Sequence, residues 1–106
     1  MLTVIETALF VRYAKEIWSD EEREAFVGWI AENPVAGDVI PGTDGLRKVR
    51  WSRAGMGKQG GARTIYFLRS TEGEIVLLMA YAKAKFDNFS SDYLRRLKEA
   101  IDGSGN

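Results

Sequence analysis

The chain has 106 residues, of which 45% are hydrophobic, so length and composition predict one globular domain around a single core. It contains no cysteine and no histidine, which excludes disulfides, thiolate chemistry and the commonest metal ligands. We therefore expect no metal and no cofactor. No signal peptide and no apolar run long enough to cross a membrane are visible, so the expected location is the cytoplasm, without membrane contact.

The net charge is zero, but the charges are unevenly distributed along the chain. Residues 1–38 carry three bases and eight acids, a net charge of −5, and residues 39–69 carry seven bases and one acid, a net charge of +6. Residues 70–106 carry five bases and six acids, a net charge of −1. A concentrated basic segment can bind anions despite a neutral total. A solvated surface without any ligand is the alternative interpretation.

The first part of the chain predicts a strand followed by two helices. Residues 2–10 are rich in β-branched side chains and predict the strand. Apolar residues then follow at helical spacing: Phe10, Tyr13, Ala14, Ile17 and Trp18. The sequence SDEE at 19–22 is a capping box for a second helix, which is expected to end before Pro34. The glycines and prolines of residues 34–45 predict a loop.

The second part predicts three strands and a final helix. Residues 46–53 and 62–69 are expected to form strands joined by a glycine-rich connection, and residues 70–74 a turn. Residues 75–83 are apolar at both parities, which is typical of a central strand covered on both faces. Ser90 or Ser91 can cap the last helix.

These elements predict an α+β fold in the order β-α-α-β-β-β-α. The short connections between the last three strands indicate an antiparallel meander, so the twisted sheet should be mostly antiparallel. Two helices lie near the N-terminus and one at the C-terminus. We expect a single domain over residues 1–102 and a flexible tail over residues 103–106.

The glycine-rich stretch WSRAGMGKQGGAR, residues 51–63, suggests two kinds of phosphate-binding loop, and neither fits. Gly55, Gly57 and Gly60 match a dinucleotide-binding spacing, but that motif requires a helix where this chain predicts a strand. A P-loop requires Ser or Thr at the position of Gln59. The stretch is therefore interpreted as a hairpin connection whose glycines permit positive φ.

The cations beside this connection are expected to gather on one face of the sheet. Alternate residues of a strand share a face, so Lys48 and Arg50 point the same way and Trp51 points into the core. Arg63 begins the next strand, within cross-strand reach of both. The last strand is expected to add residues of one parity: Tyr81, Lys83 and Lys85. Such a face suits the phosphates of RNA.

The chain resembles the RelE/ParE toxin superfamily, and within it the HigB-type toxins. The resemblance lies in the order of the elements and in three stretches: NPVAGDVIPGTDGLRKVRW, GKQGGARTIYFL and LLMAYAKAKFDNFS. It extends over residues 5–101. It implies the toxin of a bacterial type II toxin–antitoxin system, a ribosome-dependent endoribonuclease that cuts mRNA in the A site. In this chemistry the 2′-hydroxyl attacks the adjacent phosphate without a metal.

The resemblance also implies the partners of the chain. They are the ribosome and mRNA, together with a cognate antitoxin that is expected to be a helix-turn-helix protein of the HigA type. Contact with operator DNA is expected only through the antitoxin.

Carried over by position, the family's catalytic residues fall on basic side chains of this sequence: Lys48, Arg50, Arg63, Lys83 and Lys85. Further RNA contacts are expected from Arg47, Arg53, Lys58 and Tyr81. Ala84 stands where the archetypal member has an arginine. The archetype's tyrosine in the final segment also has no clear counterpart, because that region offers Phe86, Phe89, Ser90 and Tyr93, with Tyr81 before it. The identities of the general acid and base therefore stay open.

Two other functions remain as alternatives. A ParE-like member would poison gyrase without cutting RNA, although the combination of Lys48, Arg50 and Arg63 argues weakly against it. A non-catalytic RNA- or ribosome-binding module would keep the basic face and lack the acid and base.

Overall fold

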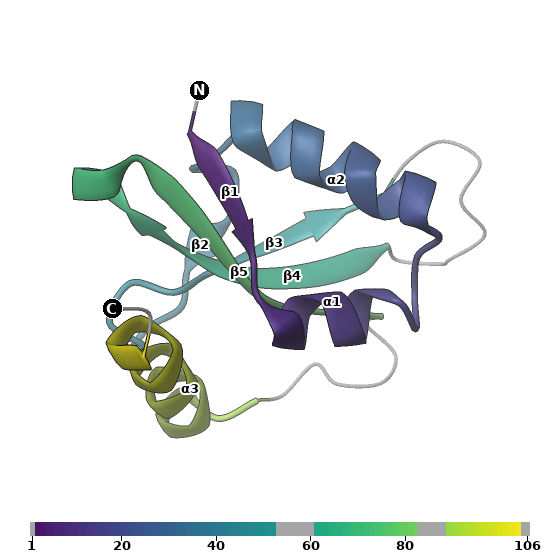
Figure 1. The fold of residues 1–106 in the computed structure, drawn as a ribbon. Coiled ribbons are helices and arrows are strands. Elements are labelled where there is room, and N and C mark those ends of the chain that lie inside the picture. The colour runs from purple at the N-terminus through teal and green to yellow at the C-terminus, as the bar shows by residue number, and fades with distance from the viewer. Residues whose placement is uncertain (1, 53–60, 83–88, 105–106) are drawn as a thin grey trace.

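The computed structural model describes residues 2–52, 61–82 and 89–104, and Figure 1 shows their arrangement. The elements are β1 (Thr3–Glu6), α1 (Ala8–Ala14), α2 (Asp20–Glu32), β2 (Asp38–Val39), β3 (Arg47–Trp51), β4 (Ala62–Arg69), a 3₁₀ turn (Ser70–Glu72), β5 (Glu74–Ala82) and α3 (Ser91–Ser104). The α+β class and the predicted order are confirmed, with β2 as an additional short strand. Helix α3 continues into the segment that was expected to be a tail.

The strands form one sheet in the order β1-β5-β4-β3-β2. The β3, β4 and β5 strands make the predicted antiparallel meander, and β1 pairs with β5 in parallel. Residues 75–81 of β5 are buried, as expected for a central strand. Gly73 closes the turn between β4 and β5 in the left-handed region, with φ of 65°.

The caps of the first two helices explain where each begins. Thr7 caps α1 because its hydroxyl accepts a hydrogen bond from the Phe10 N–H (3.1 Å) and donates one to the Leu77 carbonyl (2.7 Å). The strand predicted over residues 2–10 was therefore too long. The capping box of α2 is confirmed, with Ser19 and Glu22 each accepting from the other's backbone N–H, at 3.1 and 2.9 Å.

The predicted loop over residues 34–45 is fixed to the sheet and contains β2. The Tyr66 hydroxyl accepts from the Gly37 N–H (2.9 Å) and donates to the Pro34 carbonyl (2.8 Å). The Arg47 guanidinium donates to the Gly37 carbonyl (2.7 Å). A Cβ at Gly37 would lie 3.0 Å from the Lys48 backbone and from the Tyr66 ring, so only glycine fits there without displacing a neighbour.

The sheet has a separate apolar cluster on each face. Helices α1 and α2 cover one face, where Phe10, Trp18, Phe26 and Trp51 interlock. The expectation that Trp51 belongs to the core is confirmed. Helix α3 supplies Leu94 to the cluster on the other face. In Figure 1, α3 lies at the opposite end of the sheet from the place where β3 ends and β4 begins.

Candidate active site

The register of β3, β4 and β5 aligns three of the expected site residues in one row. Arg50 lies directly opposite Arg63, and Arg63 lies directly opposite Tyr81. Directly opposed residues in antiparallel strands project from the same face of a sheet. The three side chains therefore share the face that α3 partly covers. Lys48, two residues before Arg50 on β3, belongs to this face as well.

Gly61 sets the geometry at the start of this row. Its φ is 70°, and a Cβ at this position would lie 2.9 Å from the Trp51 carbonyl oxygen. A side chain is therefore excluded by both conformation and space. Gly61 allows β4 to begin so close to the end of β3 that Arg63 comes directly opposite Arg50. The expectation that a glycine of this connection adopts positive φ is consistent with Gly61.

The exposed fraction of the residues in the row falls from the sheet edge towards the centre of the sheet. Arg50 is exposed, Lys48 is half-buried, and Arg63 and Tyr81 have exposed fractions of 9% and 3%. A guanidinium beside an apolar cluster interacts more strongly with an anion than one in open water, because fewer water molecules screen it. Directly opposed like charges also repel each other, so an anion placed between Arg50 and Arg63 would be stabilised.

An aromatic stack borders the row on the side of α3. The Phe89 ring meets Tyr81 edge to face, with 5.4 Å between centroids, and stacks on Tyr93 at 5.7 Å with an interplanar angle of 15°. Tyr93 is 46% exposed. The sequence suggested Phe89 and Tyr93 only as alternatives to the archetype's tyrosine. Phe89 precedes the first residue of α3, so helical spacing does not predict its contact with Tyr93.

Arg47 is not part of the row. It alternates with Lys48 along β3 and so projects from the opposite face, where its guanidinium is hydrogen-bonded to the Gly37 carbonyl. Four other expected site residues lie outside the described residues: Arg53, Lys58, Lys83 and Lys85.

Charged groups add to the apolar contacts of Leu94, Leu97 and Ile101 in holding helix α3 to the same face of the sheet. Arg69 Nε lies 2.9 Å from Asp102 Oδ1, and Arg69 Nη1 lies 3.1 Å from Glu74 Oε1. The hydrogen bonds to Glu74 and then to Asp102 raise the pKa of Arg69 above its ordinary value. The Lys98 ammonium lies 4.9 Å from the centre of the Phe67 ring, within the range of a cation–π contact.

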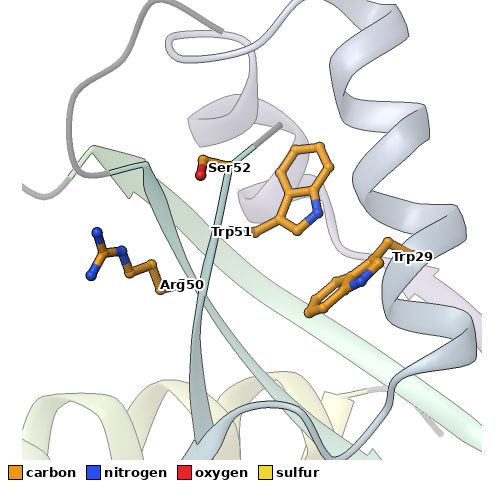
Figure 2. A pocket seen from close by; sticks show the side chains of 4 residues that line it. All are labelled: Trp29, Arg50, Trp51 and Ser52. Carbon is orange, nitrogen blue, oxygen red and sulfur yellow. The ribbon is translucent and has the colours of Figure 1, made fainter. Parts of the chain in front are cut away.

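A shallow pocket of about 500 Å³ lies at the outer side of β3. Its lining residues are Trp29 of α2 and the consecutive residues Arg50, Trp51 and Ser52. Figure 2 shows the two indoles near each other on one side of β3, while the Arg50 guanidinium projects from the other side.

The chemistry of the row is that of anion binding and charge stabilisation. Guanidinium groups bind phosphate oxygens through paired N–H donors, and an ammonium adds a point charge. No group of three or more carboxylates that could hold a metal occurs in the described part of the chain. The arrangement therefore fits a phosphodiester whose charge is neutralised by side chains.

A family model described as the RelE toxin of the RelE/RelB toxin–antitoxin system matches residues 2–103. The chain belongs to this family. Its fold is also similar to a solved structure of a double mutant of the Escherichia coli toxin RelE in the free state, with 12% identity and a TM-score of 0.56. The match covers 79% of this chain and 86% of that chain. At such low identity it supports the fold alone.

Membership of the RelE toxin family confirms the resemblance seen in the sequence at the level of a RelE-like toxin. The protein is thus a toxin of a toxin–antitoxin system, and the family implies a cognate antitoxin as its partner. The HigB subtype stays a prediction. No helix in the described segments is long and apolar enough to span a bilayer.

Proposed function

We propose that this RelE-like toxin is a ribosome-dependent endoribonuclease that cuts mRNA in the A site and so inhibits translation in the cytoplasm. The observation that carries the proposal is the row of Arg50, Arg63 and Tyr81, with Lys48 beside it, on one face of the sheet. Family membership supports the same activity. The sequence adds Lys83 and Lys85 as further site residues.

The proposed reaction needs no cofactor and no metal. The mRNA 2′-oxygen attacks the adjacent phosphorus and loses its proton to a base, while the bond from phosphorus to the 5′-oxygen breaks. The leaving 5′-oxygen takes a proton from an acid, and the product is a 2′,3′-cyclic phosphate. The transition state carries more negative charge on the phosphoryl oxygens than the substrate does, so cations held in place beforehand accelerate the step.

Each residue of the row has a physical role in this proposal. Arg63 holds the scissile phosphate with two N–H donors, because the planar guanidinium matches two phosphate oxygens and the residue lies directly opposite Arg50 in the sheet. Lys48 and Arg50 bind the neighbouring phosphate oxygens. Lys83 or Lys85 donates the proton to the 5′-oxygen, a role that a positioned lysine can take as a general acid.

The Tyr81 hydroxyl lies in the same row, where it can contact RNA. Arg53 and Lys58 would extend the basic surface towards RNA or the ribosome. Arg47 is left out of the proposed site because its guanidinium is used on the other face.

In-vitro translation of a defined mRNA on programmed ribosomes tests the function directly. The expected result is cleavage within translated codons, in phase with the reading frame, leaving cyclic phosphate ends. Translation arrest without cuts would instead indicate a non-catalytic ribosome-binding module. Unaffected translation combined with inhibition of purified gyrase would indicate a ParE-like poison.

The proposed antitoxin is a helix-turn-helix protein of the HigA type, and operator DNA is contacted only through it. Expression of the toxin without an antitoxin should arrest growth, and co-expression of the antitoxin should restore it. Normal growth at high levels of soluble, folded toxin would contradict the proposal.

A further inference from the structure

The pocket at the outer side of β3 has aromatic walls that are held in place by packing. Its two indoles are those of Trp29 in α2 and Trp51 in β3. Each packs on the buried Phe26 ring, at 6.2 and 5.4 Å between centroids. Trp51 is 9% exposed, and Trp29 is half-buried, so part of the Trp29 side chain faces solvent. The volume of about 500 Å³ lies within the range of small-ligand sites and can hold one nucleobase.

The polar groups of the pocket are mostly hydrogen-bond donors. Arg50 and Ser52 line it beside the indoles, and both are exposed. Arg50 forms no ion pair with any described residue, and the indole N–H groups of Trp29 and Trp51 make no hydrogen bond within the described segments. None of the described lining residues is acidic. The pocket therefore favours a ligand that is planar, anionic and rich in hydrogen-bond acceptors.

A nucleotide of RNA has all three properties. Its base stacks on an aromatic side chain whatever the sequence, because every base has a π-face. The edge of the base carries acceptors for an indole N–H, and the phosphate pairs with a guanidinium. The net charge of +6 over residues 39–69 attracts a polyanion to this part of the molecule. An apolar side chain of a protein would fill the space between the indoles but would leave the guanidinium without a counter-ion.

Arg50 connects this pocket to the basic row. It lines the pocket, and it lies directly opposite Arg63 in the register of β3 and β4. Neighbouring strands are about 4.8 Å apart, so an RNA chain with one phosphate at Arg63 brings the next phosphate within reach of Arg50. Figure 2 shows the Arg50 guanidinium and the two indoles on opposite sides of β3. The strand β2 pairs only with Arg47 and Lys48, so no described strand blocks the path around the edge at residues 50–52.

We propose that this pocket binds the base of an mRNA nucleotide that flanks the nucleotides held on the row. The proposal rests on the proposed nuclease function, because it takes the RNA on the row to be mRNA. The RNA backbone passes Arg50 and turns around the edge of β3, and the flanking base stacks on Trp29. The scissile phosphate at Arg63 stays outside the pocket. The stack therefore stabilises the bound substrate and the transition state equally, which lowers KM and leaves kcat unchanged.

The first test uses a 2′-O-methyl tetranucleotide of adenosine, which has no free 2′-hydroxyl to attack the phosphate, and the intact toxin labelled with ¹⁵N at tryptophan. The indole N–H signals of Trp29 and Trp51 should shift as RNA is added. Trp18, whose indole nitrogen is buried, is the internal reference and should shift much less. Trp29→Ala should weaken binding by about tenfold, the scale of one lost base–aromatic stack, and Trp29→Phe should recover most of the affinity. Thermal melts of both variants control for folding.

The second test removes one base at a time from the tetranucleotide. Loss of the base at one end should weaken binding to the wild type by about tenfold. The same RNA should bind Trp29→Ala no more weakly than the intact tetranucleotide does, because the two changes remove a single stack. Loss of the base at the other end should have a smaller effect, and this effect should be the same in both proteins.

Four results would overturn the inference. These are no binding of the tetranucleotide, binding that leaves both pocket indoles unchanged, equal binding to the wild type and Trp29→Ala, or additive losses when Trp29→Ala meets the RNA that lacks a base. The second result would assign the pocket to a side chain of a protein partner. Ribosomal RNA is the other source of a base, so binding to vacant ribosomes is measured as well. A loss in Trp29→Ala on vacant ribosomes as large as on programmed ribosomes would assign the pocket to ribosomal RNA and also overturn the inference.

Cleavage on programmed ribosomes separates this inference from the nuclease proposal. Trp29→Ala should raise KM by about tenfold and leave kcat at the wild-type value. A wild type that binds the tetranucleotide through the pocket but cuts no mRNA would contradict the nuclease proposal and leave the pocket as an RNA site. Normal cleavage with an unchanged KM in Trp29→Ala would contradict only the proposal for the pocket.

Discussion

The two faces of the sheet are closed in different ways. Under α1 and α2, aromatic rings fill the space: Trp18 stacks on Phe26 at 5.2 Å between centroids, and Trp51 meets both edge-on at 5.6 and 5.4 Å. Under α3, the cluster is mostly aliphatic and includes Leu94, and ion pairs from Arg69 to Asp102 and Glu74 lie beside it at the far end of the sheet. The basic row lies on the same second face.

This difference shows how so small a chain can both fold and bind anions. The aromatic face fixes the register of β3 and β4. Burial of its apolar side chains stabilises the fold by about 25 cal/mol per Å² of apolar surface removed from water. The charged face is then held by a rigid sheet, so Arg50 and Arg63 stay opposite each other despite their repulsion. Preorganised charge of this kind is what stabilises a developing anion.

The largest expected effect comes from breaking the aromatic face. Phe26 is fully buried, so Phe26→Ala should lower the free energy of unfolding by about 3–5 kcal/mol, through lost burial and the cavity left between Trp18 and Trp51. Urea denaturation measures the change. Tyr93→Ala, an exposed aromatic on the other face, is the control and should cost clearly less. Equal losses for the two variants would contradict the view that the aromatic face contributes more to stability than the exposed aromatic residues of the other face.

The next effect concerns the row itself. Arg63→Ala should slow single-turnover cleavage on programmed ribosomes by about 10²–10³, the scale for removing one preorganised charge-stabilising donor. Lys58→Ala should cost less than about tenfold, as expected for a peripheral RNA contact. Because Arg63 is buried, thermal melts must accompany the rates. If Lys58→Ala is the crippled variant and Arg63→Ala cuts normally, the phosphate is held by the glycine-rich connection and the row is not the site.

Local signals in the sequence predicted much of this arrangement. Alternation along β3 placed Lys48 and Arg50 on one face and Trp51 on the other, and the short glycine-rich connection predicted that Arg63 returns beside them. Within a strand, the face on which a side chain lies follows from its position in the sequence, so it can be predicted without knowing the tertiary structure. The capping box of α2 was predictable for the same reason.

Other features depend on long-range contacts and could not be predicted. The pairing of β1 with β5 joins segments about 70 residues apart. The two residues of β2 are too few to show any period, and the segment just before them is held by hydrogen bonds of the Tyr66 hydroxyl with Gly37 and Pro34. Alternation along β3 already places Arg47 on the face opposite Lys48, but its bond to the Gly37 carbonyl could not be predicted from the sequence.

A smaller effect should come from the Tyr66 hydroxyl. Tyr66→Phe leaves the Gly37 N–H and the Pro34 carbonyl without this partner, which should cost about 1–3 kcal/mol of stability. Tyr13→Phe is the control, because the Tyr13 hydroxyl forms no hydrogen bond with the described residues, and it should change stability by less than about 0.5 kcal/mol.

The pH dependence separates the hydroxyl from simple loss of packing. Burial raises the pKa of Tyr66 above its ordinary value of 10.0, although the bond from Gly37 opposes the shift. Because the folded state holds this proton more tightly than the unfolded state, the contribution of Tyr66 is complete below about pH 10 and is lost as pH rises through the folded-state pKa. The stability of Tyr66→Phe should therefore fall less steeply than that of the wild type above pH 10. Parallel curves would contradict this assignment.

The smallest expected effect tests how firmly ion pairs close the second face. Asp102 is 42% exposed and bonds to Arg69 at 2.9 Å, so solvent screens much of the interaction. Asp102→Asn should lower the free energy of unfolding by about 0.5–1 kcal/mol at low salt, and the difference should shrink in about 1 M NaCl, where charges are screened within about 3 Å. Glu99→Gln, an exposed acid on the same helix with no ion pair to the described residues, should change nothing at either salt concentration. A loss that persists in high salt would mean that Asp102 acts through its hydrogen bond to Arg69 more than through screened charge, and no loss at low salt would mean that apolar side chains such as Leu94 suffice to hold α3.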